Sequence, residues 1–140
     1  MSTAHQEKET AVVIEHMVIK RDSPEIITIK SRIFDFDWLG NNFISCLLRG
    51  LFYDCNGIVA QHEEEVVGLM VYKLKSNRIH ILNFAVHPNW RRQKIGTQMI
   101  EKLFSQLLEP IFTSVVIEVW ETNLQAQLFL KKCGFKKIRS

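Results

Sequence analysis

The most informative part of the chain is NFAVHPNWRRQKIGTQMIEKL, residues 83–103. An apolar strand pattern runs through Pro88 into a cationic connection, and a helical pattern follows from Ile95. The three cations of this connection, at 91, 92 and 94, stand at the N-terminus of the predicted helix. A helix N-terminus carries partial positive charge, so each cation costs roughly 0.3 to 1 kcal/mol unless an anion lies nearby. We therefore expect an anionic ligand here.

The patterns on either side of this stretch predict one mixed α/β sheet with flanking helices. Upstream we expect a strand at 11–19, although its pattern also fits a helix, then helices at 24–34 and 42–52 and a hairpin of strands at 57–61 and 66–75. The apolar run at 79–87 predicts a central strand. Downstream we expect a helix from 95 to just before 110, a strand at 114–120, a helix from 123 that stops at 134, and a short strand at 135–138.

Length and composition indicate one folded domain. The chain has 140 residues, of which 46% are hydrophobic and 24% charged, far from the composition of disordered chains. Only residues 1–10 have the composition expected of a flexible tail. No run of 18 apolar residues and no apolar segment after a basic start is present, so we expect neither a membrane span nor a signal peptide, and a cytoplasmic location.

The cysteines and charges restrict the ligands further. Three widely spaced cysteines without a CxxC pair predict reduced thiols and no metal site. A net charge of +3 is too small to indicate nucleic acid. However, the cations form two clusters, at 91–94 and 131–139, which we expect to face one anion.

A strand, a short connection and a helix form an arrangement in which free backbone N–H groups point at an anion. Gly96 allows the backbone to approach such a ligand closely. Neither the three spaced glycines of a dinucleotide fingerprint nor a P-loop is present. One glycine beside three cations favours a pyrophosphate held by mixed backbone and side-chain contacts.

Two motifs resemble those of the GNAT acetyltransferases. HPNWRRQKIGT, residues 87–97, is similar to the acetyl-CoA pyrophosphate motif Q/R-x-x-G-x-G/A, and LNFAV, 82–86, to the family's central strand. IEVWETNLQAQLFLKKCGF, 117–135, is similar to the second signature, which Asn123, Ala126, Gly134 and Phe135 match in type and spacing. FDFDW, 34–38, resembles the RimI-like enzymes, the N-terminal alanine acetyltransferase type. The resemblance spans 11–139.

The resemblance implies a GNAT-type mixed sheet whose central strands splay to admit acetyl-CoA. It implies acetyl transfer to an amine by direct attack in a ternary complex, without a metal or a membrane partner, and it is compatible with a homodimer. Aromatic residues after the first helix, Phe36 and Trp38, are the expected acceptor wall. The implied CoA contacts are the backbone of Phe84, Ala85 and Val86 for the pantetheine, Arg91, Arg92, Gln93, Lys94, Ile95, Gly96 and Thr97 for the pyrophosphate, and Asn123.

Glu118 is the expected general base. On the predicted strand 114–120 it shares a face with Val116 and Trp120, so a carboxylate interrupts an apolar surface. Half-buried carboxylates without partners have raised pKa values, which suits a base, and Glu118 matches the glutamate base of the RimI-like enzymes. A peptide N-terminus is the favoured acceptor, because an α-amino group of pKa about 8 is roughly a tenth neutral at pH 7, against about one lysine in 2500.

Three positions depart from the family. Lys94 replaces the usual glycine, at a conformational cost if its φ is positive. Leu130 replaces the tyrosine that protonates the leaving thiolate, and Tyr53 and Tyr72 are the only tyrosines that could substitute. Because acid catalysis is worth about 10² to 10⁴-fold and a thiol of pKa near 8.5 leaves tolerably unprotonated, we expect slower chemistry. The sequence also ends about one strand early, which predicts an exposed sheet edge or a strand from elsewhere.

Simpler interpretations stand beside these. Glu118 can be an edge charge or an ion-pair partner of Arg91 or Lys131, Asn123 an ordinary helix cap, and Trp38 core packing. For the whole protein, the alternative to an enzyme is a catalytically weak or inactive CoA-binding sensor or partner subunit. A weaker third hypothesis has the basic face binding nucleic acid.

Overall fold

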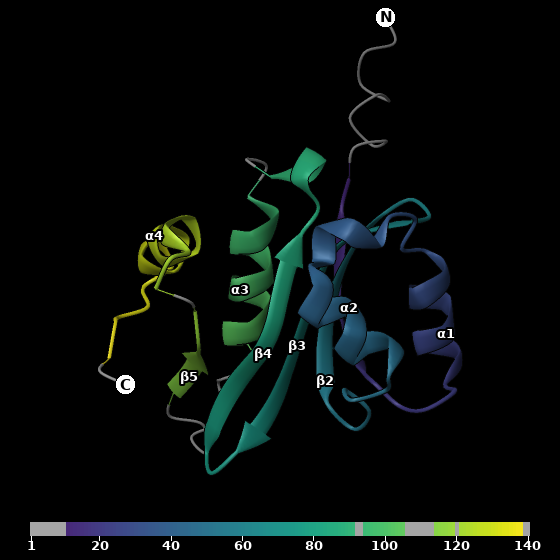
Figure 1. Ribbon diagram of the computed structural model, residues 1–140, viewed down its shortest axis with the longest axis horizontal. Coiled ribbons are helices and arrows are strands. Elements are labelled where there is room, and N and C mark those ends of the chain that lie inside the picture. Colours follow the sequence, from purple (N-terminus) through teal and green to yellow (C-terminus); the bar gives the residue numbers. More distant parts are fainter. Residues whose placement is uncertain (1–10, 92–93, 106–113, 120, 139–140) are drawn as a thin grey trace, which may run out of the picture.

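The structure is a computed structural model that describes residues 11–91, 94–105, 114–119 and 121–138. The predicted tail at 1–10, Arg92, Gln93, Trp120 and the approach of the third helix to Pro110 lie outside the described residues. Five strands form one sheet in the order β1-β2-β3-β4-β5, with β5 parallel to β4 and the other pairs antiparallel (Figure 1). The strands are β1 Val13–Val18, β2 Asn56–His62, β3 Glu65–Lys75, β4 Arg78–Val86 and β5 Ser114–Ile117.

Helices lie on both sides of the sheet, so the predicted mixed α/β architecture is confirmed (Figure 1). Local signals set several of their ends. Ser23 caps the first helix by accepting a hydrogen bond from Ile26 N at 3.3 Å, and Gly134, with φ +97°, follows the last. The helices are α1 Pro24–Ser31, the 3₁₀ helix η2 Phe36–Leu39, α2 Asn41–Leu48, the 3₁₀ helix η3 Pro88–Trp90, α3 Ile95–Ser105 and α4 Leu124–Lys132.

Two helices end earlier than the sequence predicts. Helix α1 ends at Ser31 because the next residue turns toward the sheet, where Arg32 O accepts a hydrogen bond from Val66 N at 2.9 Å. Helix α2 ends at Leu48, shortly before Gly50, whose φ of +72° is incompatible with a continuing α-helix. A hydrogen bond to the sheet therefore ends α1, and a residue in the left-handed backbone conformation ends α2.

The strand predicted at 135–138 is wrong, because these residues are described and join no ladder. Phe135 N instead donates to Leu130 O at 3.0 Å, which closes the end of α4. The ring of Phe135 also packs against Phe104 of α3, with 5.9 Å between ring centroids. The contacts of Phe135 thus hold the end of α4 against α3.

The sheet buries a separate apolar cluster on each side. Since neighbouring side chains of a strand point to opposite faces, Leu69 of β3 packs toward α1 and α2, whereas Met70 packs toward α3. Both side chains are almost completely buried, at 1% and 0% exposure. These two clusters hold β3 and β4 rigidly between the helices.

The sheet opens at the upper end of β4. The register of β3 against β4 shifts at Leu82, since Tyr72 faces Ile81 and Val71 faces Asn83, so Leu82 is an extra, bulged residue. A bulge bends its strand and increases the twist. Pairing of β4 with β5 stops at the residue before it, at Ile81. No described residue pairs with the β5 side of β4 beyond that point, which confirms the predicted splay, called the fork below.

Candidate functional site

The upper end of β4 presents backbone groups to the fork. His87 N donates to Val67 O at 2.8 Å, so the hydrogen-bonded pairs with β3 fall at His87 and, two residues earlier, at Ala85. The peptide groups of Phe84 and Val86 therefore face the other way, toward the fork. Arg91 Nε donates to Val86 O at 3.3 Å from that side. Of the backbone positions expected to hold an extended ligand, Ala85 is turned to β3 and the other two face the opening.

The N-terminus of α3 lies next to this opening. Its first backbone hydrogen bond that reaches back four residues runs from Gln98 N to Lys94 O at 2.9 Å, so the amides of Ile95, Gly96 and Thr97 precede it. The first turn contains no acidic residue that would offset the helix dipole. Lys94 has φ +62°, the positive value that the sequence made a concern, at a cost of roughly 1 to 2 kcal/mol. The helix end is thus open to an anion.

Helix α4 packs closely against this first turn. A Cβ on Gly96 would lie 3.1 Å from the Phe129 ring and 3.7 Å from the Phe84 ring, so a larger residue here would require the Phe129 ring to move. Burial raises the pKa of the Cys133 thiol, and a hydrogen bond with the Thr97 side chain partly opposes that rise. These contacts hold the turn in place from the side of α4.

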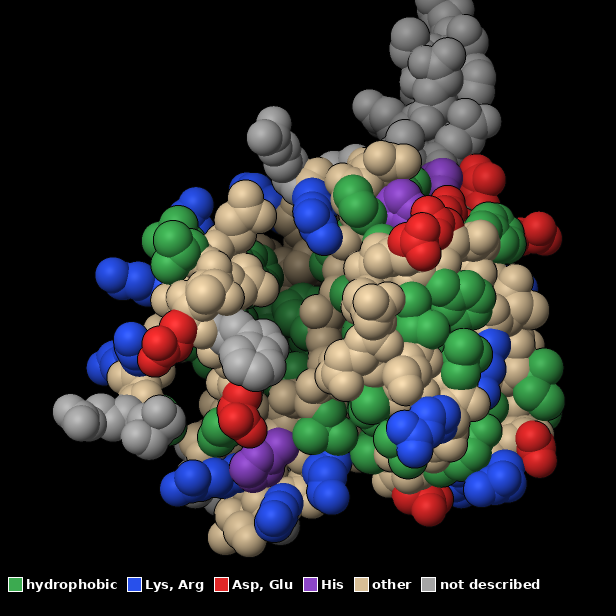
Figure 2. Space-filling model, in the orientation of Figure 1, with side chains coloured by type: hydrophobic (Ala, Val, Ile, Leu, Met, Phe, Trp, Pro, Cys, Tyr) green, Lys and Arg blue, Asp and Glu red, His purple; other side chains and the backbone are tan. Residues whose placement is uncertain are grey.

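A groove of about 820 Å³ runs between η3 and α4. Arg91 and Lys132 both line it, so the two cationic clusters of the sequence meet at one site, as predicted. Pro88, Leu128 and Phe129 add apolar surface. Figure 2 shows a hollow between the side of the molecule that carries α4 and β5 and the rest, with hydrophobic side chains at its floor. Cations beside apolar surface suit a ligand that joins phosphates to an apolar chain.

Glu118 lies at the mouth of the fork. The last pair of β4 and β5 is Ile81 with Ile117, so Glu118 is the first residue beyond the paired segment. The expectation that it interrupts a buried surface is wrong: Glu118 is exposed, because β5 ends one residue before it. No described residue forms an ion pair with it, so the alternative pairing with Arg91 or Lys131 is not formed. The carboxylate is free to meet a ligand at the fork.

Neither tyrosine replaces the family's general acid. Tyr72 is buried and its hydroxyl lies 3.3 Å from Nδ1 of His16 on β1. The ring of Tyr53 lies under the guanidinium of Arg21, 4.9 Å away. Leu130, which has no proton to donate, is itself buried on α4. The described part of the fork therefore shows no tyrosine acid.

Three other predicted site residues have structural roles. Asn123 Oδ1 accepts a hydrogen bond from Ala126 N at 3.1 Å and so caps α4. Trp38 is largely buried, and its ring centroid lies 5.6 Å from that of His87. It belongs to the apolar cluster on the α1 and α2 side of the sheet, and Phe36 is partly buried against that cluster. The structure brings Trp38 to the end of β4, as a packing residue whose indole supports the turn.

The sequence offered His87, like His80, only as a weak candidate proton carrier, and the structure gives His87 a structural role. Its Nδ1 accepts a hydrogen bond from Asn89 N at 3.1 Å, which caps η3 and places the proton of the neutral ring on Nε2. Nε2 lies 4.0 Å from Oε2 of Glu65. Nδ1 is thus engaged, and through it His87 anchors the turn from β4 into η3. The sequence signal for this role is a histidine directly before a proline at the end of a strand.

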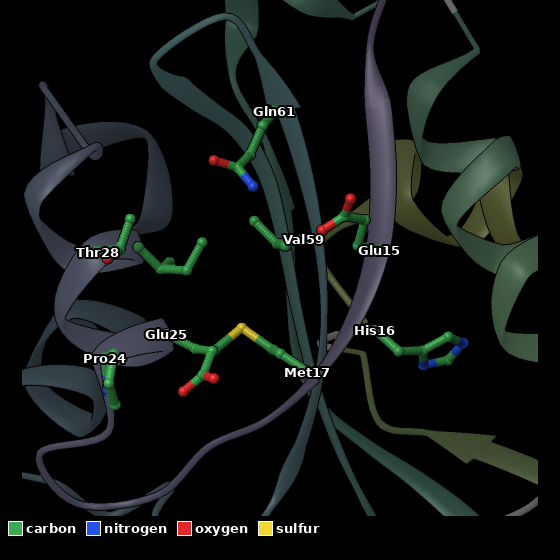
Figure 3. Close-up of a pocket in the computed structure, with 9 residues that line it drawn as sticks. Glu15, His16, Met17, Pro24, Glu25, Thr28, Val59 and Gln61 are labelled. Carbon is green, nitrogen blue, oxygen red and sulfur yellow. The ribbon is translucent and has the colours of Figure 1, made fainter.

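A smaller hollow of about 290 Å³ lies between α1 and β1, at the opposite edge of the sheet from β5. Figure 3 shows Glu25 and Met17 turned toward each other in it and His16 directed to the other side of β1. Glu15 adds a second carboxylate, and no lysine or arginine lines the hollow, so it does not suit an anion. Within the described ranges no three His, Cys, Asp or Glu side chains gather as a metal site, and no helix could span a membrane.

The open fork lies beside a cationic helix N-terminus and an apolar groove. The chain belongs to the acetyltransferase (GNAT) family, because the sequence model of that family matches residues 24–135.

Individual relatives agree with this assignment. The chain is 34% identical over 113 residues to mouse cysteine-rich protein 2-binding protein, covering 79% of this chain but 14% of the relative. It is 28% identical over 89 residues to N-alpha-acetyltransferase 30 of Dictyostelium discoideum, covering 61% of this chain and 44% of that protein. The chain thus spans less than half of either curated relative.

Solved structures share the fold. Ard1 from Thermoplasma volcanium superposes with a TM-score of 0.68 at 27% identity, over 93% of this chain and 86% of Ard1. An aminoglycoside N-acetyltransferase, AAC(6')-Iy, solved in complex with CoA, has a TM-score of 0.68 at 14% identity, over 94% of this chain and 91% of that one.

Proposed function

We propose that this protein transfers the acetyl group of acetyl-CoA to the N-terminal amine of a protein or peptide, in the manner of a RimI-like enzyme. The observation that carries the proposal is the position of Glu118, an unpaired carboxylate at the mouth of the fork. The similarity to N-alpha-acetyltransferase 30 and to Ard1 supports an N-terminal acceptor. The protein acts in a ternary complex, with acetyl-CoA and acceptor bound together.

Acetyl-CoA is held mainly by backbone groups. The pyrophosphate lies at the N-terminus of α3, where the amides of Ile95, Gly96 and Thr97 and the guanidinium of Arg91 meet it. Arg92 and Gln93, outside the described residues, complete this set. The pantetheine lies along β4 and bonds with the peptide groups of Phe84 and Val86 like an added strand.

The acceptor then loses a proton and attacks. Glu118 takes one proton from the ammonium, and the nitrogen lone pair attacks the carbonyl carbon of the thioester. The carbon–sulfur bond breaks, sulfur keeps the electron pair, and the nitrogen releases its second proton to solvent water. Without a tyrosine at Leu130 the CoA leaves as a thiolate, which a thiol of pKa near 8.5 permits. An exposed carboxylate is a better base for an α-amino group than for a lysine side chain, because the α-ammonium has the lower pKa and gives up its proton more readily.

The test is CoA thiol release from acetyl-CoA with a panel of peptides that have free N-termini. Matched peptides with a blocked N-terminus and a free lysine, and an aminoglycoside, complete the panel. We expect release with free N-termini, and a loss of about 10² to 10⁴-fold in kcat for Glu118→Gln at unchanged CoA affinity. The control is Glu121→Gln, an exposed carboxylate outside the fork. Equal rates for Glu118→Gln and wild type would remove Glu118 from the mechanism.

A second candidate is favoured by Leu130, whose side chain cannot donate a proton: a CoA-binding sensor or partner subunit of low activity. Both candidates require CoA to raise the free energy of unfolding, by about 2.7 kcal/mol at a hundred times its dissociation constant. Binding without thiol release above background, for every amine in the panel, would favour the sensor. Failure of CoA to shift the unfolding transition would exclude both.

A further inference from the structure

His80 and Glu118 lie close to each other beside the fork. The Cα partner of His80 on β5 is Val116, and Glu118 is two residues further along, directly after the last paired residue. Two residues of chain span at most roughly 7 Å and neighbouring strands lie about 5 Å apart, so the two residues are near neighbours. Paired residues point to the same face of the sheet, which His80 shares with Val116.

This face is the one opposite the CoA groove. Ile79 and Ile81, on either side of His80, pack in the cluster beneath α3, so His80 points away from α3. The groove and the N-terminus of α3 lie on the α3 side, so the acetyl group passes through the fork to reach the acceptor on the face of His80.

The ring of His80 is held in place but is chemically free. It is half-buried between two paired strands, and no described residue forms a hydrogen bond with it. The charged groups that face it are Lys73, directly opposite on β3, Arg78, two residues back on β4, and Glu118. By contrast, Nδ1 of His87 accepts a hydrogen bond from Asn89 N. Imidazole is the side chain that exchanges protons most readily near neutral pH.

We propose that His80 relays to solvent the proton that Glu118 takes from the attacking amine. This inference rests on the proposed function and adds a second residue to it. His80 acts through Glu118 and does not touch the thioester. The ammonium proton passes to the Glu118 carboxylate, then through one water to the His80 ring, which releases it to bulk solvent. Overall, an ammonium and acetyl-CoA give an amide, a CoA thiolate and two protons. The relay carries one of these protons, and the thiolate takes up the equivalent of the other from water to give CoA thiol.

The kinetic test compares His80→Gln and His80→Asn with wild type from pH 6 to 9. We expect kcat/KM for a peptide acceptor to fall about 10- to 100-fold and the acidic limb of the pH profile to change shape, with CoA affinity unchanged. The double variant Glu118→Gln/His80→Gln is expected to be no slower than Glu118→Gln alone, because both act on one proton. Lys73→Gln, which alters the charge facing His80 without removing a proton carrier, is the control.

The second measurement does not depend on turnover. The NMR resonances of the His80 ring at one fixed pH are expected to shift in Glu118→Gln, because the two residues are neighbours, and to stay in place in the control Glu121→Gln. Unshifted His80 resonances, or full kcat/KM with an unchanged pH profile in His80→Gln, would overturn the relay alone. A wild-type protein without acetyl transfer would overturn the proposed function and the relay with it, even with shifted resonances.

Discussion

The two sides of the fork are built in different ways. On the CoA side, Gly96 is packed so closely against Phe129 that a Cβ would meet the ring at 3.1 Å, and β4 is held by its ladder with β3. On the acceptor side, Glu118 is exposed and has no partner among the described residues. In the proposed mechanism, the half of the fork that binds CoA is therefore made of backbone and packing, and the half that transfers the proton is made of isolated side chains. Substitutions in the first should change affinity, and those in the second should change rate.

The largest effect is expected from Gly96→Val. Two additional methyl groups next to Phe129 displace the first turn of α3 and its amides, so CoA affinity should fall about 100-fold or more. Isothermal titration calorimetry with CoA measures this change. Gly96→Ala should weaken binding less, and Phe129→Leu should restore part of that loss by making room. Wild-type affinity in Gly96→Val would show that the amides of this turn do not hold the ligand.

The next largest effect is expected from Leu130→Tyr, on the side of the fork proposed to transfer protons. Leu130→Tyr places a hydroxyl at the family's acid position, and we expect kcat to rise about 10-fold, at the low end of what a positioned acid contributes. Leu130→Phe has the ring without the hydroxyl and should not gain. Since Leu130 is buried, thermal melting of both variants must accompany the kinetics. Equal rates for the two variants would mean that thiolate departure does not limit turnover.

A third prediction concerns a histidine that lies away from the fork. Burial lowers the pKa of His16, the backbone of Lys102 partly opposes this, and the Lys102 charge lowers it again; Tyr72 faces the ring from β3. The unfolded chain, with a value near 6.5, then binds more protons than the native state. Stability should thus fall as pH drops below about 6.5, by less than the single-proton limit of about 1.4 kcal/mol per unit.

Urea unfolding at pH 7.5 and pH 5.5 measures this change, with His16→Gln as the comparison. The variant should lose less stability between the two pH values than wild type. An equal loss in both proteins would assign the pH dependence to other groups, while the activity differences between the two sides of the fork should be unaffected.

The smallest effect is expected from Lys94→Gly. The φ of +62° is strained for lysine and free for glycine, but glycine also gains entropy in the unfolded chain, so the net stabilisation should be at most about 1 kcal/mol. Chemical denaturation without CoA measures it. CoA affinity should fall slightly through the lost charge. A destabilised Lys94→Gly protein would show that the lysine side chain supports the turn in a way its backbone does not reveal.

Local signals in the sequence predicted much of the architecture. Ser23 and Asn123 cap their helices and Gly134 ends one, because capping involves groups within about four residues of each other. The apolar run through 79–87 predicted the central strand, and the cations after it predicted an anion at the next helix. The same local patterns failed at 135–138 and at the ends of α1 and α2, where contacts distant in sequence determine the backbone.

The chemistry of the fork, by contrast, depends on register. The amino-acid order specified which residues are apolar, charged or turn-forming, and so the strands, the helices and the cationic loop. The bulge at Leu82, the exposure of Glu118 and its nearness to His80 follow from how β4 pairs with β3 and β5. A shift of one residue in that pairing would move every side chain to the other face, and the energy that selects the register comes from packing across the whole sheet.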